Sequence, residues 1–392
     1  MRRFAPPCRT ILPLALGLAL FAAPPGCRNE SWPLWPAFTA HFIDHATGRV
    51  ADPSGDQRTT SEGQAYALFF ALVANDRPAF DRILAWTEAN LASGDLATHL
   101  PAWLWGKDKD GQWKILDPNS AADADIWLAY TLIEAGRLWR APSDAALGHT
   151  MLALIAKTEV ANLPGFGPML LPGSSGFQHG NAATLNPSYL PLFVFERFAA
   201  IDSSGPWSAI AQDIPRLLDE SARHGFAMDW VAYVPGDGFH PVADPATAGS
   251  GGAATPAPVG SYDAIRVYLW AGMTSPEDPA RADILNSIAA MGAYLATHSA
   301  PPEKVSDQGV PSDGSGPIGF SAALIPYLRA LPGTRRAASL QTIRLSTQRN
   351  SATGLYGNSG AYYDQCLALF STAFSTGKFS FAPGGELIVK LN

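Results

Sequence analysis

About twelve segments of the sequence have the apolar periodicity of helices, and they alternate between two kinds. One kind is apolar on nearly every side, as in YALFFALVA, YLPLFVF and GFSAALIPYL. The other kind has one apolar stripe. In PAFDRILAWTEANL, the stripe consists of Phe80, Ile83, Leu84 and Leu91. The expected helices begin near Trp35, Ser61, Pro78, Ala121, Ser143, Pro187, Pro206, Tyr262, Pro279, Pro317, Arg336 and Gly360.

The alternation predicts how these helices are layered. A helix that is apolar all round is buried all round, whereas a helix with one stripe covers it from outside. The nearly apolar helices are those from Ser61, Ala121, Pro187, Tyr262, Pro317 and Gly360. Six inner helices alternating with outer ones predict an all-α fold, an (α/α)6 barrel. A helical solenoid is the alternative, but no sequence repeat of fixed short period is present.

Local signals add detail at the helix starts and between the helices. Ser61 and Gln64 form an S-x-x-Q pattern, which predicts a capping box, and Pro78, Pro206 and Pro279 stand where a first helical turn tolerates proline. Segment 226–242 predicts a β-hairpin with Pro-Gly-Asp-Gly at its tip. A second hairpin is expected at the C-terminus, where KFSFA and ELIVK flank Pro-Gly-Gly, and segments 100–119 and 163–180 also carry turn and strand signals.

The N-terminus has the pattern of a targeting segment. A short basic stretch, MRRFAPPCRT, precedes the apolar run ILPLALGLALFAA, which ends in small residues. This pattern predicts a signal peptide at residues 1–26, and the run is too short and interrupted for a membrane span. We therefore expect a periplasmic or secreted protein that is not an integral membrane protein. Residues 27–392 are expected to form one domain, with 246–260 as a low-complexity surface insertion.

Cysteine usage leaves two alternatives open. Cys27 follows the apolar run and is a candidate for lipid attachment, although Pro24, Pro25 and Gly26 fit a lipidation motif poorly. In an oxidising compartment, Cys27 and Cys366 are alternatively candidates for one disulfide.

Composition excludes some function classes. The net charge is -7 and no Lys/Arg-rich block occurs, which argues against a nucleic-acid partner. The eight His are scattered and no G-x-S-x-G motif is present, so Ser-His-Asp chemistry has little support. Eleven Trp and eleven Tyr favour sugar binding, because aromatic faces stack on sugar rings, although such residues also fill cores.

Three acidic residues, Glu62, Asp123 and Asp263, each open an apolar helical segment. Carboxylates are rarely buried without a partner or a task, and paired carboxylates are the groups that hydrolyse glycosides. Each has a structural alternative. Glu62 is also placed to interact with a helix dipole, and Asp263 to form an i,i+3 ion pair with Arg266. Asp123 and Asp125 are likewise candidates for first-turn dipole partners, and for Asp125 this is the favoured interpretation. A metal site at the Asp123 and Asp125 pair is disfavoured, because no His or further acid stands at ligand spacing.

Five motifs in order extend this interpretation: TTSEGQAYALFFALVANDR, LPAWLWG, AADADIWLAYTLIEAGRLW, NPSYLP and SYDAIRVYLW. With them the chain resembles glycoside hydrolase family 8, from about Trp32 to Leu387, and within it the endo-1,4-β-glucanases of cellulose-synthesising bacteria. The resemblance implies an (α/α)6 barrel that hydrolyses internal bonds of non-crystalline β-1,4-glucan with inversion and without a cofactor. It also implies a role in cellulose biosynthesis and an association with a cellulose synthase complex.

The resemblance also implies roles for individual residues. Glu62 matches the general acid, Asp263 the general base, and Asp123 a carboxylate that binds and distorts the sugar. Ala122 departs from the family pattern, which commonly has Ser or Thr there. The matching substrate-binding residues are Trp103, Tyr189, Arg266 and Tyr363. Trp103 and Trp105 alternate along an extended segment, so one is expected to face the cleft and the other the core.

The proposed chemistry makes demands on acidity. An inverting hydrolase needs a protonated carboxyl and an ionised one about 6.5–9.5 Å apart, with space for a water. Apolar neighbours should raise the pKa of Glu62, and Arg266 should keep Asp263 ionised. The alternatives are a chitosanase, mixed-linkage β-glucanase or xylanase of the same family, or a non-catalytic glucan-binding scaffold.

Overall fold

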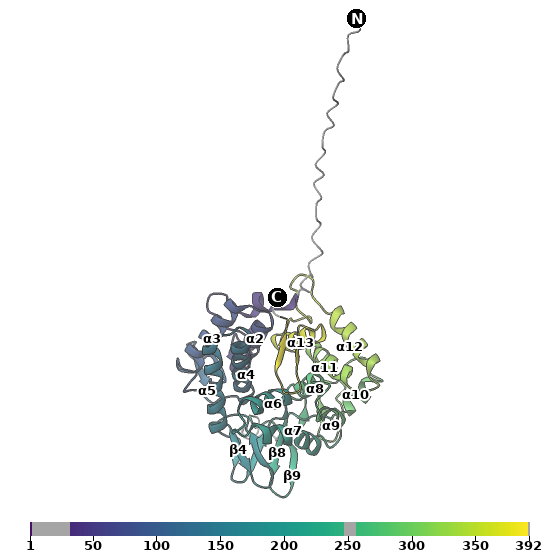
Figure 1. The fold of residues 1–392 in the computed structure, drawn as a ribbon. Helices are drawn as coiled ribbons and strands as arrows, with labels where there is room; N and C mark the ends of the chain where they lie inside the picture. The colour runs from purple at the N-terminus through teal and green to yellow at the C-terminus, as the bar shows by residue number, and fades with distance from the viewer. Residues whose placement is uncertain (2–31, 247–255, 391–392) are drawn as a thin grey trace. The chain divides into compact units, whose positions relative to one another are not determined.

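Six helices lie side by side in a closed ring in the computed structural model, which describes residues 1, 32–246 and 256–390 (Figure 1). α2 contacts α4, α4 contacts α6, α8 contacts α11, and α13 contacts α11, α8 and α2. The 3-10 turn η2 (Pro187–Tyr189), which precedes α6 in the chain, contacts α4 and α8. The inner helices are α2 (Ser61–Val73), α4 (Ala122–Leu138), α6 (Leu192–Ile201), α8 (Ala264–Met273), α11 (Ile318–Ala330) and α13 (Tyr362–Ser375).

A second layer of helices surrounds this ring. Figure 1 shows α3 and α5 outside α2 and α4, and α12 outside α11. Likewise α7 contacts α6, α9 contacts α7 and α8, and α1 contacts α13. The predicted (α/α)6 barrel is therefore confirmed, with one expected helix split into α9 and α10. The outer helices are α1 (Leu34–Phe42), α3 (Arg77–Leu91), α5 (Pro142–Thr158), α7 (Trp207–Ser221), α9 (Arg281–Ser287), α10 (Ala290–Leu295) and α12 (Arg335–Thr347).

Burial follows the two hydrophobic patterns. All ten residues of α8 are buried, whereas only four of the 13 residues of α12 are. Aromatic rings fill the inside of the ring: Phe370 lies 5.0 Å from Tyr66, 5.2 Å from Trp127 and 5.1 Å from Trp270 between ring centroids. A barrel filled by side chains from four inner helices has no central channel, so a site must lie at one of its ends.

The predicted capping box at the start of α2 is wrong. Thr60 is the N-cap, and its hydroxyl accepts the N–H of Gly63 at 3.1 Å. Gln64 instead turns outward, where it accepts the N–H of Val50 at 2.6 Å and donates to Thr87 of α3 at 2.9 Å. Buried backbone and hydroxyl groups need partners, so the Gln64 amide joins three segments rather than closing its own turn.

The strands form short antiparallel hairpins between the helices. Both predicted hairpins are present, and in Figure 1 the labels β4, β8 and β9 stand together at the lower end of the view. The sheets are β1 (Thr59–Thr60), β2 (Leu104–Lys107) and β3 (Trp113–Asp117); β4 (Val160–Leu163) with β5 (Gly167–Leu170); β6 (Gln178–His179), β7 (Ala182–Leu185), β8 (Trp230–Val234) and β9 (Gly238–Val242); β10 (Val259–Gly260) with β11 (Val305–Ser306); and β12 (Phe379–Phe381) with β13 (Leu387–Val389).

The C-terminal hairpin is fastened to the later turns of α4. Tyr130 donates to the carbonyl of Gly385 at 2.8 Å, and the fully buried Glu134 accepts the N–H of Leu387 at 3.1 Å. Glu134 also pairs with Arg197 of α6 at 2.6 Å. Because the hairpin contacts the later turns of α4, the first turn of this helix is left for other partners.

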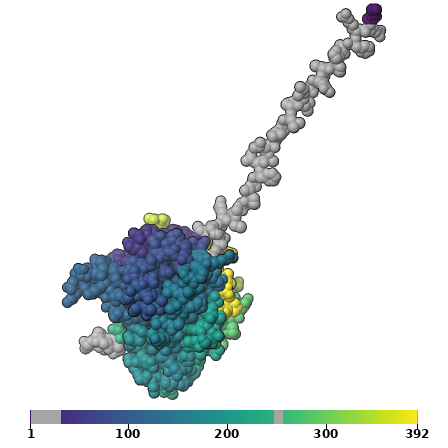
Figure 2. Space-filling model, turned by 60° about the vertical axis from the view of Figure 1, so that its left-hand side comes forward, coloured from purple at the N-terminus to yellow at the C-terminus, as the bar shows by residue number. Residues whose placement is uncertain are grey.

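Some expectations concern segments that the structure does not describe. The signal peptide, Cys27 and residues 247–255 of the expected insertion lie outside the described residues, whereas Cys366 is fully buried in α13. Residues 32–392 cluster as one compact unit. Figure 2 shows a second side of this unit, which its N-terminal half largely covers. Among the described residues, no helix has the length and apolar character needed to cross a membrane.

Candidate active site

The three predicted acids meet at one end of the ring. Glu62 is the second residue of α2, Asp123 is the second residue of α4, and Asp263 is the N-cap of α8. These positions are far apart in sequence, but each lies at the start of an inner helix. The fold therefore brings the three carboxyl groups together.

Arg266 of α8 is the centre of this group. Its Nη1 donates to a carboxyl oxygen of Glu62 and to Asp123 Oδ2 at 2.9 Å, and its Nη2 donates to Asp263 Oδ1 at 2.7 Å. Nη1 also donates to the hydroxyl of Tyr66 at 3.1 Å. The predicted i,i+3 pair is thus one part of a larger cluster in which a single guanidinium holds three carboxyl groups.

Exposure divides the three acids. The side chains of Glu62 and Asp263 are 22% and 30% exposed, whereas those of Asp123 and Arg266 are 4% and 2% exposed. Two carboxyl groups therefore face the solvent from opposite nitrogens of one guanidinium, and Asp123 lies below them.

The surroundings of Glu62 favour its protonated form. Burial raises the pKa of Glu62 to about 8, with further increases from the neighbouring charges of Asp123 and Asp263, while Arg266 acts in the opposite direction. Desolvation and like charges both disfavour a carboxylate. The expectation of a raised pKa is confirmed, and at neutral pH Glu62 holds a proton that it can donate.

Arg266 acts on Asp263 in the expected direction but is outweighed. Burial raises the pKa of Asp263 above its usual value, even though Arg266 lowers it. Asp123 adds a raising contribution to that of burial. Asn186 also opposes the rise.

A residue that sequence reasoning missed holds the turn that carries Asp263. Asp229 Oδ1 accepts the backbone N–H groups of Ser261, Asp263 and Ala264, at 2.7, 3.2 and 2.7 Å. Since Asp263 makes no capping bond of its own, Asp229 supplies the missing acceptor at the start of α8. Burial, followed by the charge of Asp263, raises the pKa of Asp229 to about 7.

Asp125 lies in the first turn of α4, where the dipole interpretation places it, but its burial was not predicted. Asp125 is fully buried, and neither of its carboxyl oxygens has a hydrogen-bond donor among the described residues. Its neighbour is the equally buried Glu159 at the end of α5. The first turn of an inner helix is enclosed on all sides, so a first-turn acid there does not face water as it would on an outer helix.

Aromatic side chains continue from the cluster in one direction. The guanidinium carbon of Arg266 lies 5.5 Å from the ring centroid of Tyr189, whose ring is 6.3 Å from that of Trp230. Phe177 lies nearly parallel to Trp230, with centroids 6.0 Å apart and planes at 6°. Trp230 and Phe177 were not predicted, because they come from separate hairpins that meet only in the fold.

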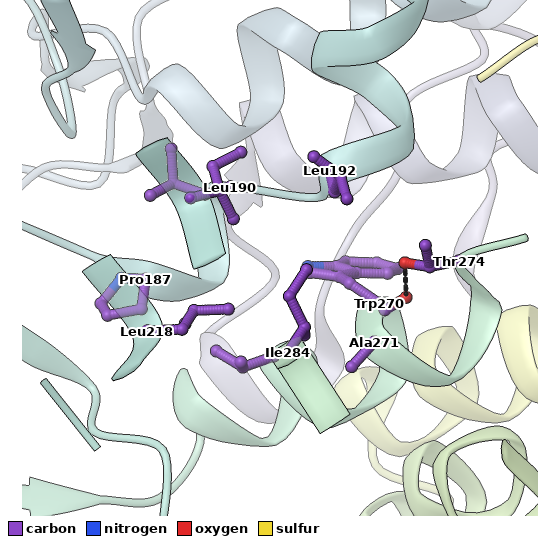
Figure 3. Close-up of a pocket in the computed structure, with 10 residues that line it drawn as sticks. Pro187, Leu190, Leu192, Leu218, Trp270, Ala271, Thr274 and Ile284 are labelled. Carbon is purple, nitrogen blue, oxygen red and sulfur yellow. Dashed lines mark hydrogen bonds between the residues drawn. The ribbon is translucent and has the colours of Figure 1, made fainter. Parts of the chain in front are cut away.

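The turn that carries Tyr189 rests on an apolar base. Trp270 of α8 donates from its indole nitrogen to the carbonyl of Ser188 at 2.9 Å. Figure 3 shows the Trp270 ring with Leu192 and Ile284 around a cavity next to this turn. The cavity has room for about one water molecule. It is therefore a small gap in the apolar core, and this core supports the turn that carries Tyr189. The cavity is too small for a sugar.

The remaining predicted aromatics differ in their partners. Tyr363 donates to the carbonyl of Tyr262 at 2.8 Å, and its pKa, raised by burial, is also affected by Arg266 and Glu62. Trp103 is partly exposed, and its carbonyl accepts the N–H of Ser61 at 3.0 Å. Its indole contacts no other ring within the described part of the chain. Trp103 is thus fixed by its backbone next to Glu62 while its ring stays available.

Trp105 is the packed member of the alternating pair. Its ring lies 5.3 Å from Trp86 and 4.7 Å from Trp113, with the Arg49 guanidinium 4.5 Å away. No three His, Cys, Asp or Glu side chains in the described ranges are grouped so as to hold a metal ion. The site described above consists of carboxyl groups, the Arg266 guanidinium and aromatic rings.

Comparisons with known proteins show which family the chain belongs to. The model of the glycosyl hydrolases family 8 matches residues 6–377, and the chain therefore belongs to this family. It is 46% identical to an endoglucanase of Xanthomonas axonopodis pv. citri, over 95% of this chain and 92% of that protein. It is 41% identical to an endoglucanase of Escherichia coli K12, over 95% and 94%. The crystal structure of an endo-1,4-D-glucanase from Vibrio fischeri superposes with a TM-score of 0.81 at 38% identity, over 92% and 99% of the two chains.

Proposed function

We propose that the protein hydrolyses internal β-1,4-glucosidic bonds with inversion, with Glu62 as general acid and Asp263 as general base. As a member of family 8 whose relatives over nearly the full length are endoglucanases, it is a glycoside hydrolase, an endo-1,4-β-glucanase. The observation that carries the proposed roles is the pair of partly exposed carboxyl groups on opposite nitrogens of Arg266.

The acidity of Glu62 supports the first half of the reaction. With a pKa of about 8, Glu62 is protonated at neutral pH and can protonate the glycosidic oxygen as the bond to the leaving sugar breaks. Arg266 is bonded to Glu62 and is positioned to stabilise the carboxylate that forms. This contact makes the loss of the proton easier at the moment when it is transferred.

Asp263 supports the second half. Its carboxylate is held by Arg266 and is 30% exposed, so a water molecule can reach it. Two hydrogen bonds and the width of a guanidinium separate Asp263 from Glu62, which leaves room for an attacking water between base and sugar. That water gives a proton to Asp263 while its oxygen bonds to the anomeric carbon from the face opposite the leaving group.

Asp123 is assigned to the sugar at the cleavage point. It lies below the two exposed acids, with Oδ2 on Arg266 and Oδ1 on the N–H of Ala124 at 2.8 Å. A fixed carboxylate below the two partly exposed acids can bind sugar hydroxyls and hold a distorted ring. Distortion and hydroxyl contacts of this kind lower the barrier by several kcal/mol. No step requires a cofactor.

We expect Trp103 to bind sugar by stacking. Tyr189, Tyr363 and Arg266 are also proposed to bind substrate. Trp103→Ala should reduce kcat/KM on cello-oligosaccharides, by about tenfold if one stacked ring is lost, because stacking contributes roughly 1–3 kcal/mol. The melting temperature should stay near that of the wild type. Trp105→Ala is the matched control, since Trp105 packs on two rings and should lose stability instead. The reverse pattern would show that Trp103 is a core residue.

Substrate preference is tested by a reducing-sugar assay on carboxymethyl cellulose, lichenan, chitosan and xylan. Carboxymethyl cellulose should be cleaved fastest, with a rapid fall in viscosity because internal bonds are cut. A preference for chitosan or xylan would overturn the assignment to β-1,4-glucan. Binding without cleavage would favour a non-catalytic scaffold. A scaffold, however, would not account for the pairing of Glu62 and Asp263 on one guanidinium.

We infer that the protein is exported to the periplasm or secreted, after removal of residues 1–26, and that 27–392 act as one catalytic domain. The basic and apolar pattern of the N-terminus supports export. Intact mass of periplasmic protein should show a start between Ala23 and Cys27, and an unprocessed or lipid-modified chain would contradict this. We also infer a function in bacterial cellulose biosynthesis, beside a cellulose synthase complex. It is tested by the yield and crystallinity of cellulose in a strain that lacks the protein.

A further inference from the structure

Behind Asp123 lies a second pair of acids that the reaction above does not use. Asp125 lies in the first turn of α4, Glu159 is the C-cap of α5, and both side chains are fully buried. The two carboxyl groups lie within hydrogen-bonding reach of each other. Among the described residues, Asp123 is the one other charged group that acts on either of them, and it is also acidic.

The oxygens of this pair lack donors. Neither Asp125 oxygen nor Glu159 Oε2 has a partner among the described side chains and backbone groups. Within the described ranges, the one hydrogen bond to the pair is donated by the Ser120 hydroxyl to Glu159 Oε1, at 2.5 Å. Two ionised carboxylates cannot remain buried in contact without a cation or donors. One proton between them removes the conflict, because an acid O–H then donates to the neighbouring carboxylate.

The pair is connected to the segment that carries Asp123. The Ser120 hydroxyl, which donates to Glu159, accepts the N–H of Ser174 at 3.0 Å. The N–H of Ala122 is bound by the carbonyl of Pro172 at 2.9 Å. The N-cap of α4 is an alanine without a side-chain capping bond. Contacts to Glu159 and its neighbours therefore replace a cap and set the position of the first turn.

We propose that Asp125 and Glu159 share one proton and act as positioning residues, which hold the first turn of α4 so that Asp123 faces Arg266. This inference rests on the role proposed above for Asp123. Asp125 carries the proton, and the Glu159 carboxylate accepts the hydrogen bond that the Asp125 O–H donates. Burial raises the pKa of Asp125 well above its usual value, with a further rise from Glu159. Burial also raises the pKa of Glu159, to about 7, but hydrogen bonds from Ser120 and Asp125 oppose this rise.

A shared proton has a measurable consequence for stability. Native Asp125 keeps its proton at pH values where the unfolded chain has released it, so stability falls as pH rises between the unfolded and the native pKa. Asp125→Asn keeps the shape and an N–H donor toward Glu159 but has no proton to lose. Between about pH 5 and pH 7, the unfolding equilibrium constant of the wild type should rise more steeply than that of the variant, by a further factor of about ten per pH unit.

Activity tests the positioning. Asp125→Ala should lower kcat at least about tenfold with a smaller change in KM, and Asp125→Asn should restore most of it, because the amide donates to Glu159 in place of the acid. If Asp125→Ala does not fold, Glu159→Gln is used instead. The amide of the new side chain donates to Asp125, so this variant should also flatten the pH dependence of unfolding. Glu196→Gln is the control. Glu196 has a pKa raised to about 9 beside Asp278 on the outer side of α6, so its loss should leave kcat unchanged.

Equal pH slopes for the wild type and Asp125→Asn would overturn the shared proton. Full kcat in Asp125→Ala would overturn the positioning. The unfolding experiment uses no substrate, so its result stands apart from the role of Asp123, which Asp123→Asn tests separately through kcat.

Discussion

Glu62→Gln and Asp263→Asn are each expected to lower kcat by at least about 10²–10⁴-fold, the usual contribution of a general acid or base. Both substitutions keep the shape of the side chain and a hydrogen-bonding group toward Arg266. The fold should therefore survive, and circular dichroism and the melting temperature check this. The double variant should lose much less than the product of the two single losses, because groups that act as a unit are not additive.

The pH dependence separates the two roles. Glu62 must be protonated to act, so kcat/KM of the wild type should fall as pH rises through about 8, the pKa of Glu62. The remaining activity of Glu62→Gln should lack this alkaline fall. Asp283→Asn is a matched control, because Asp283 is a first-turn acid of the outer helix α9 and is exposed. A variant of Glu62 that keeps the wild-type alkaline limb would show that another group is the acid.

Arg266→Met is expected to abolish activity and to lower the stability of the fold. It leaves Glu62, Asp123 and Asp263 together without the guanidinium that contacts all three. Removing one partner from a buried ion pair costs about 3–5 kcal/mol, because the other charge is left uncompensated. The carboxyl pKa values should rise further, since Arg266 lowers those of Glu62 and Asp263. Urea unfolding and kcat on cello-oligosaccharides measure the two effects.

Two further variants show whether the loss of activity is specific. Arg266→Lys keeps the charge but loses the planar fork that reaches several carboxyl groups, so it should recover part of the stability and little of kcat. Arg197→Met removes a cation from the buried Glu134 at the later turns of α4. It should lower stability without a comparable loss of kcat. If Arg266→Met kept kcat within a few-fold of the wild type, the cluster would not be the catalytic centre.

Much of the fold and the centre of the site could be predicted from local patterns. Nearly apolar and one-striped helices predict the inner and outer layers, because burial on all sides selects for apolar residues on all sides. Glu62, Asp123 and Asp263 are conspicuous because each interrupts such a segment at its start. Three helix starts in one ring then bring them together.

Other features depended on contacts between distant segments. Gln64 was predicted to close its own turn, but Val50 and Thr87 offered it partners that only the fold brings near. The pairing of Asp125 with Glu159 could not be predicted, because α5 brings Glu159 near only in the folded chain. The row of Tyr189, Trp230 and Phe177 likewise forms only where two hairpins meet. The raised pKa of Asp263 could not be predicted, because the i,i+3 cation is visible in the sequence whereas desolvation and the charge of Asp123 are not.

Proton NMR of fresh hydrolysate tests the central claim most directly. If Glu62 is the acid and Asp263 the base that activates water, the first product signals must be those of the α-anomer, followed by mutarotation toward β. Initial β product would mean that a carboxylate attacks the sugar directly at a separation of about 5–5.5 Å from the acid, and the roles assigned to Glu62 and Asp263 would be wrong.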